Sequence, residues 1–184
     1  AVSLVDGNIY SNGSLWEELY RSIQKAEKFI YGTGWSFWVH TFFVRDPQDD
    51  ESEFGKLLKD KAEAGVRVML LVWDDQTSGN ILMGKAGLMG TKDEETRDFF
   101  ANTPVVAKLV ARKTDEKTSL VKRMYSSSVY THHQKCTIMD QPDEATGKKK
   151  IVAYVGGIDI TTGRYDDPSH QLFSTMKVSR TSPP

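Results

Sequence analysis

The chain has 184 residues, of which 24 are basic and 25 are acidic, so its formal net charge is -1. This length suits a single domain with a sizeable core, or one half of a larger catalytic unit. The near balance of charge does not favour a nucleic-acid binder, because such proteins usually present a strongly basic surface.

Strand-like and helix-like segments alternate along the chain. Helices are expected where apolar residues recur at intervals of three and four, and where Ser or Thr precedes Glu by three residues, as at Ser14 and Thr91. Strands are expected where β-branched and other apolar residues run together. In chain order we expect a helix from Ser14 to about Lys28, a strand at 29–32, a helix at 53–65 ended by Gly65, a strand at 66–73, a helix from Thr91 through Phe100, and strands at 105–112, 131–140 and 150–157.

This alternation predicts an α/β fold with a central mixed, largely parallel sheet flanked by helices, formed by residues 1–184 as a single domain. Residues 66–73 are almost all apolar, so we expect this strand to be buried on both faces of the sheet. Asp74 and Asp75 follow it, at the carboxyl end where α/β folds place ligands, although simple strand termination explains them equally well.

The stretch THHQKCTIMD, residues 131–140, sets a His and a Lys two residues apart in a strand-like run. Side chains at i and i+2 of a strand share a face, so we expect His133 and Lys135 to lie side by side. An imidazole can attack phosphorus while a Lys offsets charge on phosphate oxygens, which suits a phosphoryl centre. Asp140 is placed to orient an imidazole through a hydrogen bond. From spacing alone, however, a polar and solvated strand face is the simpler interpretation.

Gly156, Gly157 and Asp159 follow the last expected strand. Paired glycines let the backbone approach a ligand closely, and their N–H groups can face phosphate oxygens. These three residues are therefore candidates, with His133 and Lys135, for binding a phosphate. A Gly-Gly-x-Asp segment taken alone is more often a turn.

Residues 34–43, with the sequence GWSFWVHTFF, contain five aromatic residues: Trp35, Phe37, Trp38, Phe42 and Phe43. The favoured interpretation is that they belong to the core and cover the sheet. The alternative is an apolar rim that meets lipid chains at a bilayer interface, where Trp is common.

His133, Lys135 and Asp140 together match the HxKxxxxD signature of the phospholipase D superfamily without a gap. Further segments resemble the eukaryotic, plant-type phospholipase D enzymes in the same order: YGTGWSFW, VRVMLLVWDDQTS, MGTKDEETRDFF and IVAYVGGIDITTGRYDDPSHQLF. The resemblance covers about Val2 to Met176. By this resemblance the chain is the N-terminal half of the catalytic region of such an enzyme.

The resemblance implies hydrolysis of phosphatidylcholine and related phospholipids to phosphatidic acid and a free head group, together with transfer of the phosphatidyl group to alcohols. Members of the family have two similar α/β halves, each with one HxKxxxxD motif, and the active site lies between them. One histidine attacks phosphorus and becomes a phosphohistidine, and the other protonates the leaving group. The resemblance makes His133 the nucleophile, Lys135 the phosphate clamp and Asp140 a support of the histidine arrangement.

The chain departs from the family in carrying one motif, because neither His40 nor His170 has a Lys two residues later. We therefore expect a C-terminal half with the second motif as a partner, outside this sequence. Small bacterial members instead pair two single-motif chains, so a homodimeric phosphodiesterase or nuclease is one alternative. A non-catalytic lipid-binding domain is another. The near-neutral charge argues against nucleic acid as a partner.

The resemblance also implies calcium as a cofactor, with Asp6 and His170 matching family residues near a calcium site. Calcium prefers oxygen ligands, so a His ligand is unusual, and both residues also suit a surface loop. We recognise no signal peptide and no apolar run of about 20 residues. Cys136, the one cysteine, has no partner for an internal disulfide. These features predict a cytoplasmic protein that meets the phospholipid membrane surface peripherally.

Overall fold

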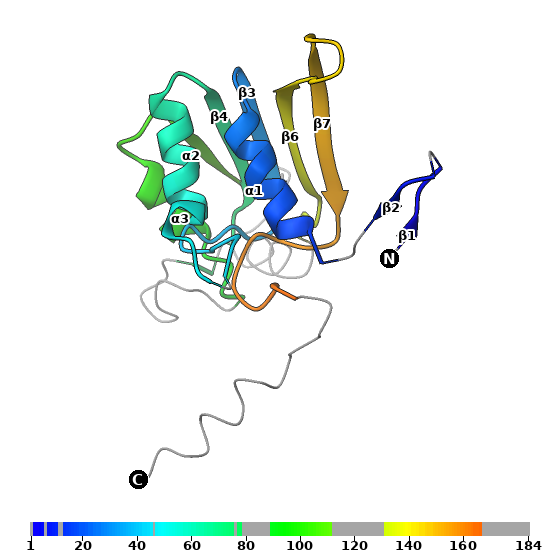
Figure 1. Ribbon diagram of the computed structural model, residues 1–184. Helices are drawn as coiled ribbons and strands as arrows, with labels where there is room; N and C mark the ends of the chain where they lie inside the picture. The colour runs from blue at the N-terminus through cyan, green and yellow to red at the C-terminus, as the bar shows by residue number, and fades with distance from the viewer. Residues whose placement is uncertain are drawn as a thin grey trace.

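The computed structural model describes residues 2–5, 7–10, 13–45, 47–75, 77–78, 89–111 and 131–166. In these residues a five-stranded sheet carries a layer of helices (Figure 1). The helices are α1 (Leu15–Lys25), α2 (Phe54–Glu63) and α3 (Asp93–Phe100), with a short 3₁₀ turn η1 (Asp50–Ser52). The strands of the sheet are β3 (Phe29–Gly34), β4 (Arg67–Trp73), β5 (Val106–Val110), β6 (Lys135–Pro142) and β7 (Lys149–Gly156). A separate hairpin of β1 (Val2–Ser3) and β2 (Ile9–Tyr10) precedes α1.

The sheet has the strand order β5-β4-β3-β6-β7. The strands β3, β4 and β5 pair in parallel, whereas β6 is antiparallel to both of its neighbours, β3 and β7. It follows that β7 runs in the direction of β3, so only β6 opposes the other strands. This confirms the predicted α/β fold with a mixed, largely parallel sheet. The carboxyl ends of β3, β4, β5 and β7 meet the amino end of β6 at one edge, where polar residues after the strands gather.

The three helices form one layer over the sheet, in which α1 contacts β6 and α2, α2 contacts β4 and α3, and α3 contacts β5. In α1 the apolar side chains of Trp16, Leu19 and Ile23 recur at the helical spacing and are 5%, 5% and 0% exposed. Burying a large apolar side chain contributes about 1.5–3 kcal/mol relative to leaving it in water. This apolar stripe explains why α1 lies on the sheet.

Alternate residues of β4 are exposed. Met69 and Leu71 are 37% and 41% exposed, whereas Val68, Leu70 and Val72 are buried. The prediction that this strand is buried on both faces is therefore wrong. The physical reason is that α1, α2 and α3 form a single layer, so within the described residues helices cover only one face of the sheet.

Helix α1 begins where predicted, with Ser14 at its N-cap, but it lacks the predicted capping contact and ends earlier than expected. Ser14 makes no side-chain cap hydrogen bond, and its hydroxyl donates instead to the carboxylate of Glu18. The helix ends at Lys25, three residues before the expected end, because Ala26 has an extended backbone with a ψ of 135°. The extended residue starts the short connection to β3.

The other two helices begin and end close to their predicted limits. Gly65 follows α2 with a φ of +93°, which confirms its role at the helix end, since only glycine adopts this conformation without strain. Helix α3 begins at Asp93, and the hydroxyl of Thr91 donates to the Asp93 carboxylate at 2.9 Å.

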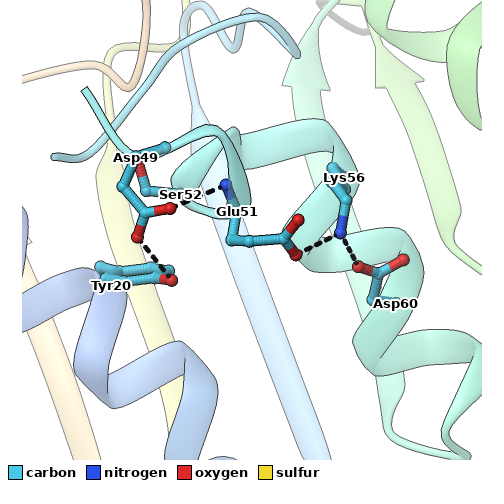
Figure 2. Close-up of polar contacts among 6 residues, drawn as sticks. All are labelled: Tyr20, Asp49, Glu51, Ser52, Lys56 and Asp60. Atoms are coloured by element: carbon cyan, nitrogen blue, oxygen red, sulfur yellow. Dashed lines mark hydrogen bonds and ion pairs between the residues drawn. The ribbon is translucent and has the colours of Figure 1, made fainter. Parts of the chain in front are cut away.

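A polar network joins α1 to the segment that leads into α2 (Figure 2). The Asp49 carboxylate accepts hydrogen bonds from the Tyr20 hydroxyl at 3.2 Å and the Glu51 N–H at 3.0 Å. Lys56 lies between the carboxylates of Glu51 and Asp60, at 2.5 and 2.7 Å. Hydrogen bonds to Asp60 and then Glu51 raise the pKa of Lys56 above its ordinary value. The network ties the chain between β3 and α2 to the middle of α1.

Candidate active site

His133 and Lys135 lie at the edge of the sheet where β6 begins and β7 ends. Lys135 is the first residue of β6 and pairs with Gly156, the last residue of β7. The Lys135 Nζ lies 3.4 Å from Nδ1 of His133 and donates a hydrogen bond to the His133 carbonyl oxygen at 3.1 Å. The expected proximity of the two side chains is therefore confirmed. His133 is exposed, whereas the Lys135 side chain is 9% exposed.

Lys135 forms a buried ion pair with Asp159. Its Nζ lies 3.1 Å from Asp159 Oδ2, and the Asp159 side chain is 3% exposed. The other carboxylate oxygen, Oδ1, accepts hydrogen bonds from the backbone N–H groups of Trp35 and Ser36 at 3.0 and 3.1 Å. Asp159 thus joins the lysine to the backbone that follows β3.

Asp159 does not fit the direct contact with phosphate that the sequence suggested for it. Both of its oxygens are already bound, and a buried carboxylate repels a phosphate anion. Its geometry suits a positioning role instead, because it neutralises Lys135 and holds the ammonium at a defined place.

Asp140 lies far from His133 and does not orient the imidazole. It follows Lys135 by five residues of the same strand, which corresponds to about 17 Å, and an odd spacing places it on the opposite face. Its Oδ1 accepts hydrogen bonds from the backbone N–H groups of residues 27–29 at 3.3, 2.7 and 2.9 Å. The expected role in the histidine arrangement is therefore corrected: Asp140 anchors the connection between α1 and β3.

These contacts set the ionisation of Asp140. Burial raises the pKa of its carboxyl, but the three backbone hydrogen bonds, with a smaller effect of Lys149, outweigh burial and lower the pKa below its ordinary value. The Lys149 Nζ lies 3.6 Å from Asp140 Oδ2. Asp140 is consequently a charged anchor of the fold at neutral pH.

Gly156 and Gly157 border open space beside Lys135. A Cβ built at either position meets no atom within 4 Å. The backbone at this edge is therefore accessible, as the sequence suggested, and contact of these glycines with a phosphate stays a prediction.

Trp35 belongs to the site, although the sequence did not predict this. Its ring lies against the His133 imidazole, with centroids 5.5 Å apart and an angle of 34° between the planes. The feature of the sequence that could have indicated this role is the position of Trp35 directly after β3, at the edge of the sheet where the carboxyl ends of the parallel strands lie. Phe37 and Phe43 of the same aromatic segment are buried in the core, as the simpler interpretation had predicted.

Two buried carboxylates, Asp75 and Asp93, hold the described residues of the segment after β4. Asp75 Oδ1 accepts hydrogen bonds from the N–H and hydroxyl of Thr77, at 2.9 and 2.7 Å. Asp93 accepts from the Asp75 N–H and from the hydroxyl groups of Ser78 and Thr91. In this structure Asp75 stabilises the backbone conformation of the segment that follows β4.

No group of three or more His, Cys, Asp and Glu side chains that could hold a metal ion exists among the residues that the structure describes. Asp6 and His170, the expected calcium ligands, lie outside those residues. The calcium site therefore stays a prediction. None of the described helices has the length and apolar character needed to cross a bilayer.

An α/β domain with a histidine beside an ion-paired lysine at one sheet edge defines a candidate phosphoryl-transfer domain. A family model described as phospholipase D matches residues 22–182, and the chain belongs to this family. The resemblance found in the sequence is thereby confirmed.

The chain is similar to phospholipase D beta 2 of Arabidopsis thaliana, with 46% identity over 180 residues that cover 96% of this chain and 19% of that protein. It is 42% identical to phospholipase D alpha 1 of Ricinus communis over 181 residues, which cover 95% of this chain and 22% of the relative. The chain thus spans about a fifth of the length of these relatives. A solved structure, NucT from Helicobacter pylori, is similar with a TM-score of 0.47 and 12% identity, over 89% of this chain and 84% of that one.

Replacing Asp140 by Asn tests its role as an anchor. The substitution removes the charge that receives three backbone hydrogen bonds, so we expect the free energy of unfolding at pH 7 to fall by about 1.5–3 kcal/mol in urea titrations. A lowered folded-state pKa stabilises the fold above the unfolded pKa of about 4, and this contribution is lost as pH falls through the folded value. The difference from wild type should therefore shrink in acid, and a difference that is constant between pH 7 and pH 3 would contradict the assignment. The exposed Asp98→Asn is the matched control, with little change expected.

A double-mutant cycle tests the ion pair of Lys135 and Asp159. Asp159→Asn leaves the lysine buried without a countercharge, and we expect a loss of about 3 kcal/mol in the free energy of unfolding. Adding Lys135→Met removes the unpaired charge, so the double variant should recover part of this loss. Strictly additive effects in urea denaturation would show that the two side chains are not coupled.

Proposed function

We propose that this chain supplies one half of a phospholipase D active site, which hydrolyses phosphatidylcholine and related phospholipids to phosphatidic acid and a free head group. Transfer of the phosphatidyl group to an alcohol is part of the proposal. Its main support is the exposed His133 imidazole, held within 3.4 Å of a buried and ion-paired lysine in a chain of the phospholipase D family.

In the proposed reaction a ring nitrogen of His133 attacks phosphorus, a P–N bond forms and the P–O bond to the head group breaks. The departing alkoxide takes a proton from a general acid, and water then cleaves the P–N bond to give phosphatidic acid. One imidazole cannot be the attacking group and the acid at the same time. The acid is therefore assigned to the histidine of a second HxKxxxxD motif, in a C-terminal half outside these 184 residues.

Lys135 is suited to hold the non-bridging oxygens of the phosphate. Of its three N–H donors, one faces Asp159, one the His133 carbonyl and one the His133 ring at the longer distance of 3.4 Å. The last donor is available to a phosphate oxygen that approaches His133. Because Asp159 fixes the ammonium beforehand, little reorganisation is needed as charge develops, and one such donor contributes on the order of a 10²–10³-fold rate increase.

Trp35 adds to this arrangement. Its ring covers one side of the imidazole, and its backbone N–H is bound by the same Asp159 that binds Lys135. We assign Trp35 and Asp159 as positioning residues, whose contacts limit the directions in which His133 and Lys135 can turn.

The proposed partners are a phospholipid membrane surface, met peripherally from the cytoplasm, and the C-terminal half. Calcium enters the proposal through the resemblance alone, with Asp6 and His170 as its expected ligands. Calorimetric titration of the chain with calcium tests this: we expect saturable binding that His170→Ala weakens, and equal binding by both proteins would remove His170 from the site.

Choline release tests the central assignment. The chain alone should release no choline from phosphatidylcholine, whereas a mixture with the C-terminal catalytic half of a relative should do so in the presence of calcium. We expect His133→Ala to reduce the activity of the mixture at least 10³-fold, because it removes the nucleophile. The matched control is His132→Ala, at the neighbouring position outside the HxKxxxxD signature, which should retain activity.

Three outcomes would contradict this proposal. Choline release by the folded chain alone, with a rate that rises as the square of its concentration, would show a single-motif homodimer. Cleavage of DNA without choline release would indicate a nuclease of the same superfamily. A folded chain that binds phosphatidylcholine vesicles but remains inactive with any C-terminal half would indicate a lipid-binding domain.

A further inference from the structure

A cavity of about 160 Å³ lies between α1 and the sheet, next to the candidate active site. Its walls are mainly apolar, and Lys135 and Asp159 also line it. The apolar side chains include Leu15 and Leu19 of α1, Phe37 after β3, and Ile160 after β7. Figure 1 shows the first turn of α1 beside the carboxyl end of β7, which is where these residues come together.

Gly156 leaves this space open. It pairs with Lys135 across β6 and β7, and it follows Tyr154, whose hydroxyl contacts Ser22 Oγ of α1 at 2.7 Å. Residues two apart in a strand share a face, so a side chain at position 156 would point toward α1 and the cavity. A Cβ there meets no atom within 4 Å.

The glycines of β3 behave differently, because Phe37 packs against them. A Cβ at Gly34 would come within 2.8 Å of the Phe37 ring, and a Cβ at Gly32 would come within 2.8 Å of the Leu70 side chain and 3.3 Å of the Phe37 ring. Gly156 has neither such a neighbour nor a φ in the left-handed region, so neither packing nor backbone conformation requires glycine there. The absence of a side chain at this position leaves the cavity open to a ligand.

We propose that this cavity binds a short aliphatic chain whose terminal oxygen lies beside Lys135. The apolar walls suit a hydrocarbon chain, and the lysine ammonium suits a hydroxyl or phosphate-ester oxygen. A cavity of roughly 150 Å³ holds a molecule the size of benzene, so the space accepts about four to six carbon atoms. Two complete acyl chains do not fit.

This inference rests on the proposed function, in which Lys135 holds the oxygens of the reacting phosphate. Two molecules in that reaction carry an aliphatic chain on an oxygen: a primary alcohol that accepts the phosphatidyl group, and the lipid itself. Both offer the same chemistry to the cavity, and their affinities distinguish them.

Methyl NMR of the 184-residue chain tests the proposal, with the Leu15 and Leu19 methyl groups as reporters. The probes are 1-hexanol, dihexanoylphosphatidylcholine below its micelle concentration, and benzene. We expect saturable shifts of both methyl groups with 1-hexanol or with the phospholipid. Saturation by the alcohol alone assigns the cavity to the alcohol that accepts the phosphatidyl group. Saturation by the phospholipid alone assigns it to the phospholipid substrate. Either result supports a cavity that binds an aliphatic chain.

Gly156→Val fills the cavity and should weaken binding of the better probe at least tenfold, with Gly156→Ala as a milder variant. Ala153→Val is the matched control: it adds volume on the same strand at an exposed position of the opposite face, and binding should not change. Circular dichroism checks that each variant is folded.

Unsaturable shifts with both oxygen-bearing probes, or unchanged affinity in folded Gly156→Ala and Gly156→Val, would overturn the proposal. Benzene binding as tightly as 1-hexanol would overturn the contact between the oxygen and Lys135. Because these experiments measure binding without turnover, a chain that binds 1-hexanol but fails to support choline release would refute the proposed function and leave the cavity assignment standing.

Discussion

The buried ion pair between Lys135 and Asp159 is the interaction on which the site depends. Lysine is costly to bury without a partner, and a carboxylate 3.1 Å away offsets that cost while fixing the ammonium. Asp159 reaches further, because its second oxygen binds the two N–H groups that follow β3. One carboxylate therefore joins the amino end of β6, the segment after β7 and the carboxyl end of β3. His133 and Trp35 are positioned by these contacts, because His133 accepts a hydrogen bond from Lys135 and the Trp35 N–H donates to Asp159.

Asp140 and Asp159 have separate structural roles. Asp140, the aspartate of the HxKxxxxD signature, lies about 17 Å along the strand from Lys135 and binds the turn between α1 and β3. Asp159, outside the signature, contacts the lysine directly. Strand β6 thus begins at Lys135, directly after the segment that carries His133, and holds toward its other end an anchor of its own position in the sheet. A motif defined by spacing can combine residues with chemical and structural roles.

Much of this arrangement could be predicted from the sequence. The spacing of two residues predicted that His133 and Lys135 lie together, and they do, although β6 begins at Lys135 and His133 precedes it. The alternation of apolar segments predicted the order of helices and strands. The separation of Asp140 from the Lys135 side chain could also be predicted, because residues five apart in a strand lie about 17 Å from each other and on opposite faces of the sheet. Strand geometry alone therefore argues against contact between Asp140 and the His133 imidazole.

Other features were out of reach because they depend on contacts between distant segments. The pairing of Lys135 with Asp159 requires the register of β6 against β7, and the packing of Trp35 on His133 requires the order β3-β6 in the sheet. The exposed face of β4 depends on where the helices pack, which a continuous apolar run does not reveal. The cavity beside Gly156 depends on the position of Phe37, which fills the space over Gly32 and Gly34 and leaves the space over Gly156 open.

The role of His133 as the nucleophile is tested most directly by locating the covalent intermediate. The chain would be mixed with a C-terminal catalytic half and phosphatidylcholine, quenched under alkaline conditions that preserve phosphohistidine, digested and analysed by mass spectrometry. If His133 is the nucleophile, the phosphatidyl adduct will be found on His133, in the peptide that also contains Lys135. An adduct found on the histidine of the C-terminal half, with His133 unmodified, would contradict this role, because His133 would then be the acid and not the nucleophile.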